Sequence, residues 1–154
     1  MRHERYELEV APDTRTFEFT SVGPKGEIPK LVIYSKIDDK NFYNLAFGDK
    51  NLDTGQIDDL VVTNNKDSQK VLATVAFTVY TFTSEYPNAL ILAEGSSKAR
   101  TRLYQMGISN NLEEITTDFV VWGEKEEIWH RFEKNIQYDS FLITRKRNVR
   151  WKNW

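Results

Sequence analysis

The feature that most constrains the fold is residues 88–108, where a continuous apolar run is followed by a turn and then by a helical pattern. Residues 89–93 read Ala-Leu-Ile-Leu-Ala, which is typical of a strand covered on both faces. Ser96 or Ser97 is placed to cap the helix that follows. The residues expected on the inner face of this helix are Ala99, Leu103 and Met106. A strand that leads into a helix N-terminus is a common place for a ligand site.

The first third of the chain predicts antiparallel strands. Tyr6, Leu8 and Val10 alternate with charged residues, and Phe17 and Phe19 repeat this period of two. The turns between strands are indicated by glycine, proline and aspartate, as in residues 23–26 and 53–55. Further strands are expected at residues 31–34, 43–47 and 57–62, and closing strands at residues 119–122, 128–129 and 141–143.

The period changes at residues 67–86, where apolar residues recur every three to four positions and predict a helix. Asp67 or Ser68 would cap its start, and Pro87 would end it. Because valine and threonine are frequent here, a strand remains the alternative, although twenty residues is long for a strand. The apolar positions are Val71, Leu72, Val75, Val79 and Phe82.

These patterns together predict an α+β fold, with a twisted, mostly antiparallel sheet and two main helices. Gly107 either ends the second helix or weakens it, and the periodicity continues or restarts at Ser109. We expect a single domain over residues 1–147 and a basic, aromatic tail over residues 148–154.

Composition excludes several classes of protein. The 154 residues contain no cysteine, so disulfides and thiolate metal sites are excluded. The formal net charge of -2 argues against general nucleic-acid binding. No run approaches the roughly 20 apolar residues of a membrane-spanning helix, and no secretory signal opens the chain, which predicts a cytoplasmic location.

Residues 56–108 resemble the core of the GNAT acyltransferase superfamily, over about a third of the chain. Residues 57–62, Ile-Asp-Asp-Leu-Val-Val, are similar to the family's fourth strand, and residues 67–86 to its cofactor helix. Leu103-Tyr104-Gln105-Met106-Gly107-Ile108 resembles the family's Leu-Tyr-x-x-x-Gly-Phe ending. The resemblance implies an acyl-CoA N-acyltransferase-like fold, with acetyl-CoA as cofactor, Tyr104 as general acid and Asp58 or Asp59 near the general-base position.

The chain departs from that family at the cofactor loop. The family has an Arg/Gln-x-x-Gly-x-Gly/Ala run there, whereas residues 64–70 contain no glycine and place Asp67 at the helix start. Ser97 and Arg100 stand where the family usually has asparagine and alanine, and strands replace its two N-terminal helices.

The whole chain also resembles an uncharacterised family of small bacterial proteins. The resemblance runs through Phe47-Gly48-Asp49, residues 57–62 and Arg100-Thr101-Arg102-Leu103-Tyr104. It implies no function.

Ser96, Ser97, Arg100 and Arg102 form a candidate anion site, because backbone N–H groups at a helix start and arginines both bind anions. Arg100 and Arg102 lie roughly 200° apart around a helix, so a regular helix presents one of them to a given ligand. The alternative is a capped surface helix with solvated or ion-paired arginines.

No metal site is predicted. Asp49, Asp53, Asp58, Asp59 and Asp67 fit no EF-hand register. The histidines, His3 and His130, belong to no HExxH motif. The arginines, lysines and tryptophans of residues 145–154 suit nucleic acid, and the alternative is a tail whose tryptophans pack on the protein.

The function expected from these observations is a non-catalytic binding or regulatory protein on an acyltransferase-like scaffold. Its expected partner is a small anionic ligand or a protein, and a homodimer is a further expectation. The alternatives are a CoA-dependent N-acyltransferase that uses Tyr104 and Asp59, and nucleic-acid binding through the tail.

Overall fold

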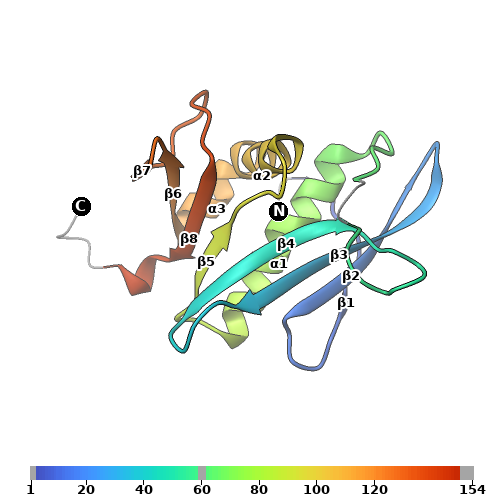
Figure 1. The fold of residues 1–154 in the computed structure, drawn as a ribbon, viewed down its shortest axis with the longest axis horizontal. Helices are drawn as coiled ribbons and strands as arrows, with labels where there is room; N and C mark the ends of the chain where they lie inside the picture. Colours follow the sequence, from blue (N-terminus) through green and yellow to red (C-terminus); the bar gives the residue numbers. More distant parts are fainter. Residues whose placement is uncertain (1–2, 59–61, 150–154) are drawn as a thin grey trace.

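The computed structural model describes residues 3–58 and 62–149, which form one eight-stranded sheet and three α-helices (Figure 1). The strands are β1 Glu9–Val10, β2 Thr16–Gly23, β3 Gly26–Lys36, β4 Phe42–Asp49, β5 Leu90–Ala93, β6 Phe119–Lys125, β7 Ile128–Arg131 and β8 Ser140–Arg145. The helices are α1 Ser68–Glu85, α2 Lys98–Asn110 and α3 Leu112–Asp118, and the 3₁₀ helix η1 spans Lys146–Asn148. The predicted α+β class is confirmed. The expected second helix is two helices, because it restarts after Asn111.

The sheet has the order β1-β2-β3-β4-β5-β8-β6-β7. Strands β4 and β5 are parallel, and every other neighbouring pair in this order is antiparallel. The parallel pair follows from α1, which carries the chain from the end of β4 back to the start of β5. The predicted, mostly antiparallel sheet is therefore confirmed.

One face of the sheet carries the core, and α1 lies behind β3 and β4 in the view of Figure 1. Alternate residues of each strand point to this face. Phe17, Val32 and Phe47 are in register across β2, β3 and β4 and pack in the core. The opposite face also carries apolar residues that lie outside the core cluster, namely Leu90, Leu92, Val120, Trp122 and Leu142.

The predicted helix at residues 67–86 is α1, and its threonines explain why β-branched residues are tolerated there. Thr78 and Thr83 are buried, and their hydroxyls donate to the carbonyls of Val75 (2.6 Å) and Val79 (2.7 Å). Each buried hydroxyl is therefore satisfied within the helix. Phe82 stacks on Tyr34 with ring centroids 4.0 Å apart, which fixes α1 against the sheet.

The expected strand at residues 57–62 is wrong for the residues that are described. Ile57 forms a single bridge with Lys50, and Asp58 and Val62 belong to no strand, while residues 59–61 lie outside the described part. The strand beside β5 is instead β4. Residues 50–58 turn back on the end of β4, so that Asp58 N–H donates to the Asp49 carbonyl (2.7 Å).

The expected inner face of α2 is confirmed at Leu103, which packs against the core, and is wrong at Ala99 and Met106. The buried residues of α2 are Arg100, Tyr104, Gly107 and Ile108, whereas Ala99 is exposed and Met106 is 38% exposed. The buried face of α2 differs from the predicted one because Arg100 and Tyr104 have polar partners inside the protein. Reading the apolar pattern alone assigns these two residues to the surface.

Candidate functional site

The site is built where β4 and β5 part. Their pairing ends at Leu45 and Ala93, yet β4 continues to Asp49. Beyond this point the backbone groups on the β5 side of β4 have lost their partner strand. A buried backbone group without a partner costs about 1–3 kcal/mol, so the gap needs hydrogen-bonding groups from elsewhere.

Two side chains of α2 fill this gap. The Phe47 N–H donates to the Tyr104 hydroxyl oxygen (3.1 Å), and Arg100 Nη1 donates to the Phe47 carbonyl (3.1 Å). Tyr104 and Arg100 are each 8% exposed. They are one helical turn apart, so both reach the same strand from one face of α2.

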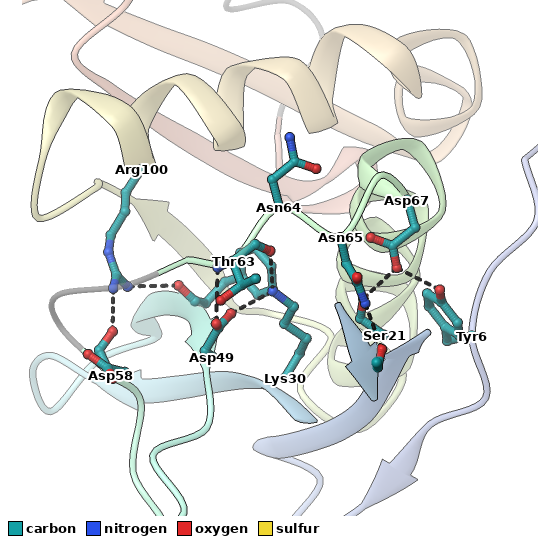
Figure 2. A network of polar contacts seen from close by, with 12 residues as sticks. Tyr6, Ser21, Lys30, Asp49, Asp58, Thr63, Asn64, Asn65, Asp67 and Arg100 are labelled. Carbon is teal, nitrogen blue, oxygen red and sulfur yellow. Dashed lines mark hydrogen bonds and ion pairs between the residues drawn. The ribbon is translucent and has the colours of Figure 1, made fainter. Parts of the chain in front are cut away.

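Arg100 also ties the segment after β4 to the helix. Its Nη2 donates to the Asp58 carbonyl, and Figure 2 shows the guanidinium between this residue and β4. Glycine at position 48 makes room, because a Cβ there would lie 2.8 Å from Arg100 Nη1. The arginine thus joins α2, β4 and the end of residues 50–58.

The Tyr104 hydroxyl is held in its neutral form. Burial raises the pKa of Tyr104 above its usual value, against the opposing effects of the Phe47 hydrogen bond and the Arg100 charge. A tyrosine with a raised pKa stays protonated at neutral pH. Its oxygen accepts a backbone hydrogen bond here, which is a structural role.

A second polar network holds the start of α1. The Ser21 and Tyr6 hydroxyls donate to Asp67 Oδ2 at 2.5 Å and 2.6 Å. Asn65 donates to Ser21 Oγ (3.2 Å) and to the Gly26 carbonyl (2.9 Å) (Figure 2). The Asp67 carboxylate therefore sits at the first turn of α1, bound to side chains of other segments, and it makes no capping bond to the helix backbone. The pKa of Tyr6 is raised, chiefly by burial and then by its bond to Asp67.

The buried ion pair of Lys30 and Asp49 lies between these two networks. Its Nζ–Oδ1 distance is 2.5 Å, and Lys30 also donates to the Thr63 carbonyl (2.9 Å). The Thr63 N–H donates to Asp49 Oδ2 (3.0 Å), so the pair fixes the chain that leads into α1. Sequence reasoning missed this pair. The available signal was alternation, because Lys30 and Asp49 continue the inward-facing series of β3 and β4.

The predicted anion-site residues do not lie together. Arg100 points inward, whereas Ser96, Ser97 and Arg102 are exposed. The Ser97 hydroxyl accepts from the Arg100 backbone N–H (3.2 Å) and caps α2, as the sequence predicts. Of the predicted catalytic pair, Tyr104 lies in the gap between β4 and β5, and Asp59 lies outside the described residues. Residues 150–154 of the predicted tail also lie outside them.

An apolar cavity and polar surface hollows adjoin these networks. An apolar cavity of about 40 Å³ lies between α1, α2 and the sheet and reaches Leu45, Tyr104 and Gly107. A polar surface hollow of about 440 Å³ lies at the start of α1 and is lined by His3, Lys66 and Gln69 among others. The first is far below the roughly 300 Å³ of typical ligand pockets.

The part of the chain that is described holds no cluster of three or more metal-binding side chains. Within that same part, no helix is long and apolar enough to cross a membrane.

The fold and the filled gap define an α+β protein whose sheet centre is closed by its own side chains. The chain belongs to a family of unknown function (DUF6934), whose model matches residues 2–146. The expected resemblance of the whole chain to a family without an assigned function is confirmed. No curated protein and no solved structure matches the chain.

Proposed function

We propose that this protein is a non-catalytic binding protein on an acyltransferase-like scaffold. The likeness lies in the parallel strands β4 and β5, each followed by a helix, and in the antiparallel strands on either side. Residues 56–108 resemble the GNAT core in sequence. The strand that pairs with β5 is β4, whereas residues 57–62 were expected to form that strand.

The observation that carries the proposal is the double hydrogen bond to Phe47. The end of β4 is the edge on which an extended ligand could add main-chain hydrogen bonds to the sheet. Arg100 and Tyr104 already occupy both backbone groups of Phe47. A ligand would have to displace a buried arginine from two carbonyls, so we expect none at this edge.

The start of α1 supports the same conclusion. Helix N-termini favour anions because their N–H groups are free and their dipole is positive. Here Asp67 brings a carboxylate to that position, held by Ser21 and Tyr6. A diphosphate would meet this negative charge, and residues 64–70 offer no glycine that would let the backbone approach it closely.

Binding is assigned to the exposed start of α2, where Ser96 and Arg102 face solvent. Arg102 is a bidentate donor suited to a carboxylate or phosphate of a small ligand or of a protein partner. Lys98 adds a second cation on the exposed first turn. Arg102 and Arg100 both belong to α2, but a ligand at Arg102 does not have to displace Arg100 from the gap between β4 and β5.

The test is an assay of thiol release from acetyl-CoA with a panel of amines, run beside thermal shifts in inorganic phosphate. We expect no thiol release above background, and a melting-temperature increase in phosphate that Arg102→Met reduces. Thiol release that Tyr104→Phe abolishes would instead establish the acyltransferase. A phosphate shift that is equal in wild type and Arg102→Met would remove the assignment to α2.

A further inference from the structure

The face of the sheet opposite the core carries a continuous group of apolar side chains. Ile91, Val121 and Ile143 are in register across β5, β6 and β8 and belong to the core, so their neighbours along each strand point to the opposite face. Phe42 of β4 lies beside Leu90 and continues this group. We call the apolar residues of this face the outer patch: Phe42, Leu90, Leu92, Val120, Trp122 and Leu142.

In the described part of the chain, no α-helix lies over the outer patch. Helices α1, α2 and α3 pack on the core face, through residues such as Val75, Ile108 and Ile115. The patch residues are half-buried, except for Val120, which is buried. A contiguous apolar group on a protein surface marks a contact site.

The 3₁₀ helix η1 brings the chain from the end of β8 to this face. Thr144 of β8 lies beside Leu90 in the register, so its side chain points to the same face as the outer patch. Asn148 of η1 donates to the Thr144 hydroxyl oxygen (2.9 Å) and to the Pro87 carbonyl (2.8 Å). Val149, the last described residue, is half-buried. The chain therefore leaves the described part beside the outer patch.

The residues that follow have the composition and the reach to cover the patch. Residues 150–154, which lie outside the described part, read Arg-Trp-Lys-Asn-Trp. They supply two large apolar rings within five positions. An extended residue spans at most about 3.6 Å, so five residues reach roughly 18 Å. Neighbouring strands lie about 4.8 Å apart, so this reach exceeds the distance from β8 to any other strand of the patch.

We propose that residues 150–154 cover the outer patch of their own chain, with Trp151 and Trp154 packed on its apolar side chains. The contact removes apolar surface from water on both sides. Arg150 and Lys152 keep their charged groups in water, because their long stems allow this beside an apolar surface. The face of the sheet away from the core then has its own cover, supplied by the chain that follows η1.

The chain itself is favoured as the occupant over a second copy or a nucleic acid, because it is tethered. Asn148 holds the start of the segment beside the patch, and a short tether gives an effective concentration of about a millimolar. A separate partner competes only at its own concentration. The inference is independent of the anion site proposed at Arg102, because α2 packs on the other face of the sheet.

The test is digestion by trypsin, because Arg150 and Lys152 are themselves cleavage sites and mass spectrometry identifies their products. A covered segment must open before the protease can cut it. Leu142→Asp places a charge in the outer patch, and we expect it to speed cleavage after Arg150 by about tenfold or more. Val22→Asp is the matched control, because Val22 is 57% exposed on β2, outside the patch, and it should leave the rate unchanged.

A second variant tests the other side of the contact. Trp151→Ser combined with Trp154→Ser leaves the outer patch intact, and it should also speed cleavage after Arg150 by about tenfold or more. Each rate is divided by that of a free peptide of the same sequence, so that the change of sequence at the cleavage site is removed. This variant carries the test if Leu142→Asp does not keep a cooperative melting transition.

A cleavage rate equal to that of the wild type in either folded variant overturns the proposal. Protection of the wild type that increases with protein concentration would assign residues 150–154 to a second copy. Protection that appears only when nucleic acid is added would assign them to that partner. Both of these results also overturn the proposal.

Discussion

At the centre of the sheet β4 runs on past its neighbour β5, and at the outer edge β7 has a neighbour on one side. Both strands therefore present backbone groups without a partner strand, but these groups differ in burial and in hydrogen bonding. The groups of Phe47 are buried and are bonded by Tyr104 and Arg100. Those of Trp129 lie at the surface, on a strand whose residues are all exposed.

The difference follows from access to water. A buried gap in a sheet must be filled by side chains, because an unsatisfied buried group costs about 1–3 kcal/mol. An exposed edge can be hydrated, so it can stay open for a second strand. The centre is thus built for stability, and the edge is available for association.

The largest effect is expected at the buried ion pair beside the gap. Lys30→Met removes the partner of a buried carboxylate, and we expect the free energy of unfolding to fall by about 3–5 kcal/mol. Lys50→Met is the matched control, because the Lys50–Glu18 pair is partly exposed, and it should cost about 0–1 kcal/mol. Urea denaturation of both variants measures the difference. Equal losses would mean that the pair does not hold the centre together.

A smaller loss is expected from the gap itself. Arg100→Met leaves the Phe47 and Asp58 carbonyls without this donor and should lower the free energy of unfolding by about 3 kcal/mol. Arg102→Met, two residues away on the same helix and exposed, should change it by about 0.5 kcal/mol or less. Thermal and urea unfolding of the pair gives the comparison. If Arg102→Met cost as much as Arg100→Met, burial would not be the cause.

Alkaline pH should lower the free energy of unfolding, because buried tyrosines must stay protonated in the folded protein. The pKa values of Tyr34 and Tyr104 are raised by burial, and that of Tyr80 is raised by burial and nearby carboxylates to about 12. The stability that these neutral tyrosines contribute is complete below pH of about 10 and is lost as the pH rises above it. Each buried tyrosine that stays protonated should then cost about 1.4 kcal/mol per pH unit.

Urea titrations between pH 8 and pH 11 test this slope, and Tyr104→Phe should make it shallower. A slope that the substitution leaves unchanged would show that Tyr104 ionises as readily in the folded protein as in the unfolded chain.

The smallest effect is expected at the β6–β7 turn. Glu126 and Glu127 both have positive φ, at 53° and 65°, where asparagine and glycine are favoured. Replacing them with Asn-Gly should raise the free energy of unfolding by about 1 kcal/mol. Urea denaturation of this variant beside the wild type measures the change. Lower stability would mean that the glutamates make contacts that outweigh their backbone cost.

The sequence predicted well what depends on local periodicity. The alternation at Phe17 and Phe19, the helix at residues 67–86 and the Ser97 cap are all present. These features follow from neighbours within a few residues in the chain. The strand order also follows the expected class, because short turns favour antiparallel neighbours.

What the sequence missed depends on distant partners. Arg100 is buried because the Phe47 carbonyl lies across the gap, 53 residues earlier in the chain. Lys30 is buried because Asp49 stands beside it in the register of β3 and β4. Alternation along β3 gave a signal for Lys30, but nothing local to Arg100 shows that its partner lies in β4. Pattern reading therefore placed the inner face of α2 on Ala99, Leu103 and Met106, of which Leu103 packs against the core and the other two are exposed.

Calorimetric titration of CoA and acetyl-CoA into the purified protein tests most directly the claim that side chains close the centre of the sheet. We predict that any heat or melting-temperature shift is lost in Arg102→Met, because Arg100 and Tyr104 hold the backbone of β4 and Asp67 holds the start of α1, which leaves the exposed start of α2 as the anion site. Micromolar binding that Arg102→Met leaves intact would contradict the account, since the cofactor would then enter the gap that these residues fill.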